Sequence, residues 1–213
     1  MSAGGAEPAG AARGEAPGRA AHEPERLRLF VAVFPPAATQ ALAASVGESL
    51  RTPNDGVSWV KGANLHYTLR FVGHVGQDGA RRVREATGEA ARAHGPFGLK
   101  LGPPGAFPTA KQARVIWLGT LEGAEPFAQL ATTLERGLAR RGFAPEGRPF
   151  TPHLTLGRVR TPGRDWTEAL IRARAVDHEP AARFGVEELC VVRSTLSPRG
   201  SRYEMLEVAR LGE

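Results

Sequence analysis

Apolar residues recur along this chain with two different periods, which predict alternating strands and helices. Runs rich in β-branched and aromatic residues predict strands at 26–34 ("RLRLFVAVF") and 113–119 ("ARVIWLG"). Apolar residues spaced three and four apart follow each run, at 42–50 and at 127–138, and predict amphipathic helices. A β-rich segment follows each helix in turn, so the two halves of the chain repeat the order strand, helix, strand.

The other elements complete this picture. We expect a weakly amphipathic helix at 78–93, a short strand at 97–101, a long Gly/Pro loop at 102–112, a helix at 165–175, and strands at 183–196 and 202–211. Because helices and strands are mixed and hairpins are frequent, the pattern favours an α+β fold with antiparallel sheets. The matching halves predict a bilobal, pseudo-duplicated domain in which two antiparallel sheets flank a central cleft and the helices lie outside.

The N-terminal segment differs from the rest of the chain in composition. Residues 1–25 are mainly Ala, Gly, Pro and Glu, with no large apolar residue after Met1, and we expect them to form a disordered tail. Residues 26–213 then form a single domain. No apolar run approaches the ~20 residues that span a bilayer, and no signal-peptide pattern is present. We therefore expect a soluble cytoplasmic protein that has no membrane partner.

Charge and cysteine content narrow the classes of partner. The chain has 28 Lys and Arg against 22 Asp and Glu, a net charge of +6, which favours polyanions such as RNA. Most of the basic residues are Arg in a chain rich in Ala and Gly, so a genome-composition bias explains the charge equally well. The single cysteine, Cys190, lies in the apolar run "ELCVV" and is predicted to be buried in a strand. No exposed apolar stripe stands out, and we expect a monomer.

Two copies of the tetrad His-x-Thr-apolar stand far apart in the sequence. "HYTL" begins at His66 and "HLTL" begins at His153. Neighbours two apart on a strand point to one face, so each histidine shares a face with Thr68 or Thr155 while the leucines point into a core. Two half-buried strands with their polar sides in water also produce such a pattern. That both tetrads occupy matching positions favours a common site.

The residue types of the tetrads suit phosphodiester chemistry. A free imidazole has a pKa of about 6.5, so near neutral pH one ring can accept the proton of an attacking oxygen while the other protonates a leaving oxygen. The hydroxyls of Thr68 and Thr155 can donate hydrogen bonds to the non-bridging oxygens. Arg70, which is expected to continue the first polar face, and Arg158, just after the second, can add phosphate contacts. A zinc site needs about three protein ligands, and no HExxH or clustered pattern supplies them, so we expect no metal and no cofactor.

Four aromatic residues near the predicted site are ambiguous. They either stack on a terminal base or belong to ordinary core packing. These residues are Phe34, Trp59, Phe150 and Tyr203.

The paired tetrads resemble those of the 2H phosphoesterases. Their surroundings, "RLFVAVFPP", "VKGANLHYTLRFVGHV", "ARVIWLG", "RPFTPHLTLGRV" and "SPRGSRYEML", make the chain similar to the bacterial and archaeal RNA 2′,3′-cyclic phosphodiesterases, also called 2′-5′ RNA ligases. The resemblance extends from about Arg26 to Leu206. It implies a bilobal α+β fold in which each lobe gives one tetrad to a central cleft. It also implies metal-free hydrolysis of a terminal RNA 2′,3′-cyclic phosphate to a 2′-phosphate, with reversible 2′-5′ joining of RNA ends in some members.

Carried onto this sequence, the resemblance implies roles for individual residues. His66 is the proton donor to the departing 3′ oxygen, and His153 is the proton acceptor that activates water. Thr68 and Thr155 hold the phosphate, and the partner is an RNA with a cyclic-phosphate end, for which tRNA halves are candidates. Two alternatives stay open: a phosphodiesterase for small cyclic nucleotides or 2′-5′ oligonucleotides, and a non-catalytic RNA-binding module.

Overall fold

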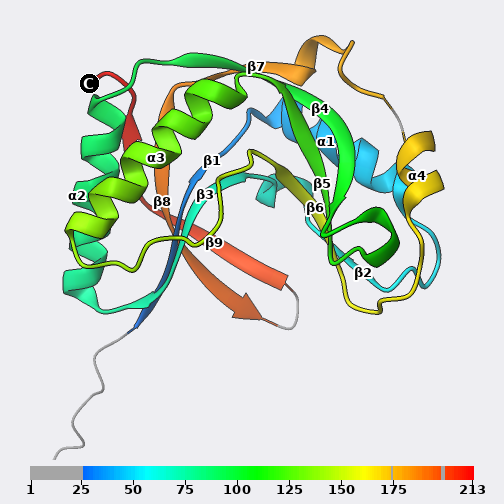
Figure 1. Cartoon of the computed structure of the whole chain (residues 1–213), viewed down its shortest axis with the longest axis horizontal. Helices are drawn as coiled ribbons and strands as arrows, with labels where there is room; N and C mark the ends of the chain where they lie inside the picture. The colour runs from blue at the N-terminus through cyan, green and yellow to red at the C-terminus, as the bar shows by residue number, and fades with distance from the viewer. Residues whose placement is uncertain (1–25, 174, 198–199) are drawn as a thin grey trace, which may run out of the picture.

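The computed structural model describes residues 26–173, 175–197 and 200–213 (Figure 1). The predicted disordered tail, residues 1–25, lies outside the described residues. The strands are β1 (Leu27–Val33), β2 (Val57–Trp59), β3 (Tyr67–Val75), β4 (Phe97–Phe107), β5 (Val115–Glu122), β6 (Leu154–Val159), β7 (Arg183–Val186), β8 (Glu188–Ser197) and β9 (Gly200–Arg210). The helices are α1 (Ala37–Leu50), α2 (Gln77–Arg92), α3 (Ala124–Arg140) and α4 (Thr167–Arg172), with short 3-10 turns at 62–64, 110–112 and 180–182.

The predicted α+β class is confirmed, but the sheet arrangement differs from the prediction. The described strands form one antiparallel sheet in the order β7-β4-β5-β6-β3-β1-β8-β9, with β2 paired to β6, instead of two separate sheets. We call β3, β1, β8 and β9 the β1 half, and β7, β4, β5, β6 and β2 the β5 half. The two halves are joined where Tyr67 of β3 pairs with Leu154 of β6. This junction brings the two tetrads together.

The helices cover the two halves separately. Helices α2 and α3 pack side by side on the β1 half, while α1 packs against the β5 half (Figure 1). Helix α3 turns Phe127, Leu130 and Leu134 into the main core, where all three are fully buried, as the apolar spacing predicts. A second, smaller apolar cluster lies on the opposite face of the β1 half. It consists of Phe30, Ala32, Cys190 and Val192, with Phe34 and Tyr203 packed against it.

Two segments fold differently from the prediction. The segment 102–107, expected to be a loop, continues β4 through Pro103 and Pro104. These prolines follow Lys100, the last residue of β4 that pairs with β7, and they coincide with an irregular step in the β4–β5 register. Proline is tolerated there because the strand has an open edge where no amide needs a partner. The expected single strand at 183–196 is divided into β7 and β8, which pair with different neighbours, β4 and β1.

Candidate active site

The β3–β6 junction aligns the two tetrads in opposite directions. Tyr67 pairs with Leu154, and both side chains are fully buried in the main core. Residues on either side of an antiparallel pair lie opposite one another, and their side chains point to the other face of the sheet. We call that other face the site face. By this register it carries two cross-strand pairs, His66 with Thr155 and Thr68 with His153.

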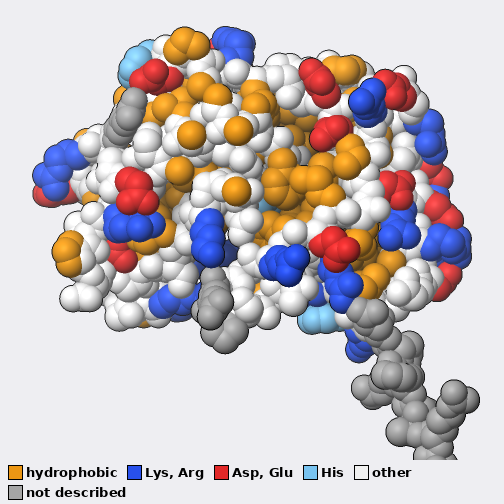
Figure 2. Space-filling view, turned by 180° about the vertical axis from the view of Figure 1, so that it is seen from behind, with side chains coloured by type: hydrophobic (Ala, Val, Ile, Leu, Met, Phe, Trp, Pro, Cys, Tyr) orange, Lys and Arg blue, Asp and Glu red, His pale blue; other side chains and the backbone are white. Residues whose placement is uncertain are grey.

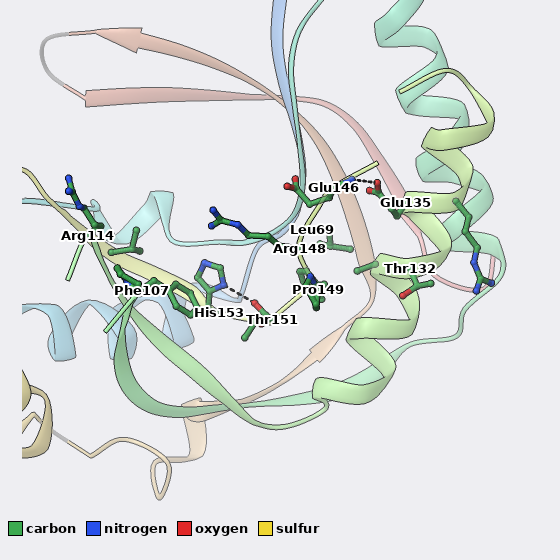
Figure 3. A pocket seen from close by; sticks show the side chains of 15 residues that line it. Leu69, Phe107, Arg114, Thr132, Glu135, Glu146, Arg148, Pro149, Thr151 and His153 are labelled. Carbon is green, nitrogen blue, oxygen red and sulfur yellow. Dashed lines mark hydrogen bonds between the residues drawn. The ribbon is translucent and has the colours of Figure 1, made fainter. Parts of the chain in front are cut away.

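The backbone orients both imidazole rings in the same way. The Nδ1 atom of His66 lies 2.7 Å from the carbonyl oxygen of Asn64, and Nδ1 of His153 lies 2.7 Å from the carbonyl oxygen of Thr151 (Figure 3). A carbonyl only accepts, so each Nδ1 carries the proton. In the neutral ring, Nε2 then has a free lone pair, and in the charged ring it has a proton to give. Each histidine is therefore equipped to act as base or acid through Nε2.

Aromatic rings enclose His66. The ring centroid of Phe30 lies 4.8 Å from that of His66, and those of Phe34 and Tyr203 lie at 5.3 Å. Burial among these rings disfavours the charged imidazole and lowers the pKa of His66 to about 4. The Asn64 carbonyl opposes this shift, while the positive charges of Arg158 and His153 add to it. His66 is therefore neutral at neutral pH when no ligand is bound.

His153 has fewer aromatic neighbours. The centroid of Phe107 lies 5.1 Å from its ring and that of Trp117 lies 6.4 Å away. Burial lowers the pKa of His153, the Thr151 carbonyl opposes this, and the charge of Arg158 lowers it further. The charge of Arg158 thus lowers the pKa of both rings, because its guanidinium lies near both histidines.

A β-bulge removes Arg70 from the site face. On β1, Ala32 lies opposite Thr68 and Val31 lies opposite Arg70, so Leu69 is an extra residue in β3. Ala32 belongs to the small cluster beside His66, whereas Val31 belongs to the main core. The prediction that Arg70 continues the face of Thr68 is therefore wrong, because the bulge reverses the alternation after Leu69.

Arg70 instead fastens a loop to helix α3. Its Nη1 donates to Oε1 of Glu135 at 3.0 Å and lies 3.6 Å from Oε2 of Glu146, and its Nη2 donates to the carbonyl of Ala144. The backbone N–H of Glu146 also donates to Glu135, at 2.7 Å. The guanidinium is thus occupied by carboxylates that hold the 144–146 loop.

A second bulge brings Arg158 onto the site face. On β5, Trp117 lies opposite Thr155 and Val115 lies opposite Arg158, so three steps along β6 match two along β5. Leu156 is the extra residue, and the side chain of Arg158 points to the same side as that of Thr155. Both bulges fall at the fourth residue of a tetrad. The structure therefore brings five of the six predicted site residues together and separates Arg70 from them.

A groove of about 900 Å³ opens beside His153 (Figure 3). It runs between the β4–β5 strands and helix α3, along the 146–151 loop, and His66 is not among the residues that line it. Figure 2 shows a hollow with apolar side chains in the middle of the face opposite to that of Figure 1, with basic and acidic side chains around it. The surroundings of the two histidines are thus unequal, since only His153 meets this groove.

The aromatic residues divide between the site and the core. Phe34 and Tyr203 contact His66, whereas the indole N–H of Trp59 donates to Asp55 at 2.9 Å, away from the histidines. Phe150 packs on Phe127, 5.3 Å between centroids, and lines the groove. Sequence reasoning missed Phe30, Phe107, Trp117 and the two carbonyls that orient the rings. No residue-type signal marks a backbone carbonyl, but the position two residues before each histidine is common to both.

The described residues have neither a metal-ion cluster nor a membrane-spanning helix. They contain no group of three or more His, Cys, Asp or Glu side chains arranged to hold a metal ion. Within the same residues, no helix is both long and apolar enough to cross a bilayer. Cys190 is buried, as predicted, and burial raises the pKa of its thiol to about 11.

Comparisons with known proteins identify the family of the chain. Residues 22–197 match the model of the 2′-5′ RNA ligase superfamily. The RNA 2′,3′-cyclic phosphodiesterase of Methanothermobacter thermautotrophicus is 34% identical over 187 residues, covering 87% of this chain and 100% of that protein. The crystal structure of TT0787 from Thermus thermophilus superposes with a TM-score of 0.74 at 30% identity, over 87% of this chain and 98% of that one. The crystal structure of E. coli LigT complexed with 3′-AMP superposes with a TM-score of 0.69 at 26% identity, over 89% of this chain and 100% of that one. The chain therefore belongs to the 2′-5′ RNA ligase superfamily, the group of 2H phosphoesterases that the paired tetrads predict.

Proposed function

We propose that this protein hydrolyses the 2′,3′-cyclic phosphate at the end of an RNA and leaves a 2′-phosphate. The observation that carries the proposal is the β3–β6 junction, which sets His66 beside Thr155 and His153 beside Thr68 on one face. Both rings have Nε2 free for a ligand because Nδ1 is bound to a backbone carbonyl. The relative from M. thermautotrophicus carries the name of this activity.

The reaction needs two proton transfers, and the two rings suit them. Nε2 of His153 takes a proton from water as its oxygen attacks phosphorus. Nε2 of His66 gives a proton to the 3′ oxygen as its bond to phosphorus breaks. The hydroxyls of Thr68 and Thr155 donate hydrogen bonds to the two non-bridging oxygens, where negative charge increases. The 2′ oxygen keeps the phosphate.

The surroundings of the rings favour this division of roles. The attacking water reaches the site from solvent, and His153 lines an open groove while His66 is enclosed by Phe30, Phe34 and Tyr203. The imidazole of His66 must be charged before Nε2 can donate a proton, but its pKa is about 4 in the free protein. The negative phosphate restores the proton, because an opposite charge nearby raises the pKa of an imidazole. We propose that binding of the phosphate itself charges His66.

Substrate recognition involves Arg158 rather than Arg70. The position of Arg158 on the site face, near both rings, suits a charge-assisted contact to a phosphate oxygen. Arg70 has no such role in this proposal because Glu135 and Glu146 occupy it. The site residues all belong to one chain, and we propose that the protein acts as a monomer and that its substrates include tRNA halves.

We also propose that residues 26–213 form one bilobal domain with an internal repeat. The order β1-α1-β3-α2 corresponds to β5-α3-β6-α4, since β3 and β6 each carry a tetrad at the start and a bulge at its fourth residue. The sheet order β4-β5-β6-β3-β1-β8 has matching elements on either side of the junction. This arrangement is typical of a pseudo-two-fold axis between β3 and β6.

The direct test is turnover of an oligoribonucleotide that ends in a 2′,3′-cyclic phosphate, in the presence of EDTA. We expect a 2′-phosphate as the product. His66→Ala and His153→Ala lose this activity, while His74→Ala, an exposed position near the end of β3, keeps it. No ring opening, or a product that is only the 3′-phosphate, would refute the proposal. Equal kcat/KM on a cyclic mononucleotide would assign the protein to small cyclic nucleotides instead.

A sulfur substitution tests which ring is the acid. In a substrate with sulfur in place of the 3′ bridging oxygen, the leaving group departs as a thiolate and needs no proton. We expect His66→Ala to recover most of its lost rate on this substrate and His153→Ala to stay slow. The reverse pattern would exchange the two roles without changing the reaction.

A further inference from the structure

We infer that the nucleotides preceding the cyclic phosphate lie across the site face of the β1 half, with a base stacked on Phe71 and a phosphate at Arg28. This inference rests on the proposed function and deepens it, because it specifies an RNA strand of several nucleotides as the substrate. The surface consists of Arg28, Phe71, Tyr203, Met205 and Val208, and we call it the open face.

The direction of the reaction places the RNA on this half of the sheet. The attacking and leaving oxygens lie on opposite sides of phosphorus in an in-line displacement. The leaving 3′ oxygen belongs to the terminal ribose and takes its proton from His66, so the ribose lies on the side of His66. The ring of His66 contacts Phe30 of β1 and Tyr203 of β9, at 4.8 and 5.3 Å between centroids. The strand that precedes this ribose is therefore directed over the β1 half, away from the groove beside His153.

Strand pairing lines up a row of apolar side chains next to this contact. Phe30 of β1 lies opposite Phe71 of β3 and Val192 of β8, and Val192 lies opposite Met205 of β9. Side chains directly opposite one another on neighbouring strands point to the same face. The row thus crosses four strands on the site face. Among the described residues, the small apolar cluster to which Phe30 and Val192 belong contains no helix residue.

The outer members of the open face are exposed to solvent. Phe71 is 45% exposed, Met205 54% and Val208 46%. Val208 lies opposite Cys190, which belongs to the same small cluster. Helix α2 covers these strands only from the main core side, where its apolar residues are buried. Large apolar side chains that are exposed together on one surface are typical of a binding site.

Arg28 and Phe71 form a preorganised contact on this face. The guanidinium carbon of Arg28 lies over the ring of Phe71, 4.5 Å from its centroid, and Nη1 of Arg28 donates to Oγ of Ser194 at 2.7 Å. Both side chains are held in place without a ligand, which lowers the entropy cost of binding one. An aromatic ring beside a guanidinium group suits single-stranded RNA, whose unpaired bases stack on aromatic side chains while arginine contacts the phosphates.

The charge of the open face also suits an RNA strand. Arg28 donates to a hydroxyl, and no described carboxylate pairs with it. Beyond the pair of Cys190 and Val208, the next pair on this face consists of Glu188 and Arg210, one charge of each sign. The guanidinium of Arg28 is therefore available to a phosphate.

The separation of His66 and Phe71 along β3 sets the length of RNA that reaches the open face. Five residues of strand span roughly 15 Å, at about 3.3 Å per residue. Stacked nucleotides advance ~3.4 Å each and extended ones advance further, so roughly two to four nucleotides bridge this distance. A mononucleotide whose phosphate lies between the histidines does not reach Phe71.

The test compares two substrates that share the reacting phosphate and differ in length. We measure kcat/KM on a 2′,3′-cyclic mononucleotide and on a hexaribonucleotide that ends in a 2′,3′-cyclic phosphate. Wild-type protein should prefer the hexanucleotide by at least about tenfold. Phe71→Ala should lose most of this preference and keep its kcat/KM on the mononucleotide. Damage to folding or to the histidines lowers both values and leaves their ratio unchanged.

Control variants separate stacking from other effects. Leu121→Ala removes a side chain of β5 that is 53% exposed and lies outside the open face, and it should keep the wild-type preference. Phe71→Tyr should keep the preference because the ring is retained, whereas Phe71→Leu should lose it. Arg28→Gln should weaken the salt dependence of the hexanucleotide KM by about one phosphate contact.

Three kinetic outcomes overturn the inference. Equal kcat/KM of wild-type protein on both substrates would leave the ring-opening reaction intact and remove the need for the open face. A wild-type preference in Phe71→Ala would place the RNA elsewhere. An equal loss on both substrates in Phe71→Ala would show that Phe71 supports His66 instead of binding RNA.

Two further measurements distinguish the remaining explanations. A wild-type dimer that dissociates in Phe71→Ala, measured by analytical ultracentrifugation, would assign the open face to a second copy of the chain. No hydrolysis of either substrate by wild-type protein refutes the proposed function itself. In that case the Kd of the hexanucleotide, measured by fluorescence anisotropy, still tests the open face, because Phe71→Ala should raise it about tenfold. An unchanged Kd would overturn the inference as well.

Discussion

The surroundings of His66 and His153 share a backbone arrangement and differ in their neighbours. Each ring is bound through Nδ1 to the carbonyl two residues earlier, at 2.7 Å, and each lies opposite the threonine of the other tetrad. Three aromatic rings pack around His66. His153 contacts two and borders the groove.

The shared backbone arrangement and the different neighbours have separate effects on the two rings. The shared Nδ1 contact with a backbone carbonyl leaves Nε2 of each ring able to accept or donate a proton. The neighbours then set the pKa, which burial lowers to about 4 for His66 and lowers also for His153. Aromatic rings thus surround His66 on several sides, whereas His153 borders the open groove.

The largest expected effect is the loss of either ring. His66→Ala and His153→Ala should each reduce kcat by about 10²–10⁴, because each removes one of two proton transfers. The double variant should be little slower than either single variant, since the rings act as a unit. Steady-state kinetics on a cyclic-phosphate oligonucleotide measures this. Independent, multiplicative losses would show that the rings do not act on one phosphorus.

The pH dependence of stability should distinguish the two rings next. Unfolded His66 binds a proton below about pH 6.5, but in the folded protein its pKa is about 4. The unfolded state binds more protons between these values, so the free energy of unfolding falls as the pH falls from about 6.5 to 4. The loss from His66 is about 3 kcal/mol.

Urea unfolding between pH 7 and pH 4 measures this slope. His66→Gln, which cannot titrate, should lose that part of the slope, and His153→Gln should lose a smaller part. A wild-type slope in His66→Gln would mean that the charged ring is tolerated in the folded protein.

The two arginines that follow the bulges should affect different properties of the protein, Arg158 the activity and Arg70 the stability. Arg158→Ala should lower kcat/KM by about 10–100-fold, the value of a hydrogen bond to a charged group, with little effect on stability. Arg70→Ala should instead lower the free energy of unfolding by about 2 kcal/mol, between the values for exposed and buried ion pairs, and reduce kcat/KM less than Arg158→Ala. Kinetics and urea unfolding of both variants test this, and the opposite assignment would contradict the positions of the bulges.

The smallest expected effect is a selective pKa change. Tyr203→Ala should open one side of His66 to water and raise its pKa toward the value of a free imidazole. Phe107→Ala should do the same for His153. NMR titration of the imidazole C–H signals resolves the two rings, and a change in the wrong ring would show that the aromatic neighbours do not set these pKa values.

Much of the site follows from alternation along a strand. The rule that residues two apart share a face places His66 with Thr68 and His153 with Thr155, and it buries Tyr67 and Leu154 between them. The rule fails for Arg70, because the bulge at Leu69 reverses the alternation of side chains along β3. Nothing in the composition of "HYTLRF" marks a bulge, which is fixed by pairing with β1.

The fold shows the same division between local pattern and long-range pairing. Helix α3 follows from its apolar spacing, which is a property of one segment. That β3 and β6 meet, and that 183–196 divides into β7 and β8, depends on which strands pair across the sheet. Such pairings join residues far apart in the sequence, and the local pattern of a single amino-acid sequence does not indicate which strands will pair.

The most direct test of the account is a crystal structure of the protein with an RNA fragment that ends in the product, a 2′-phosphate. The account predicts one phosphorus on the site face, with Nε2 of His66 and Nε2 of His153 each within hydrogen-bond distance of a different oxygen, and with the hydroxyls of Thr68 and Thr155 on the remaining oxygens. A phosphate that contacts only one of the two rings, or binds away from the β3–β6 junction, would contradict it.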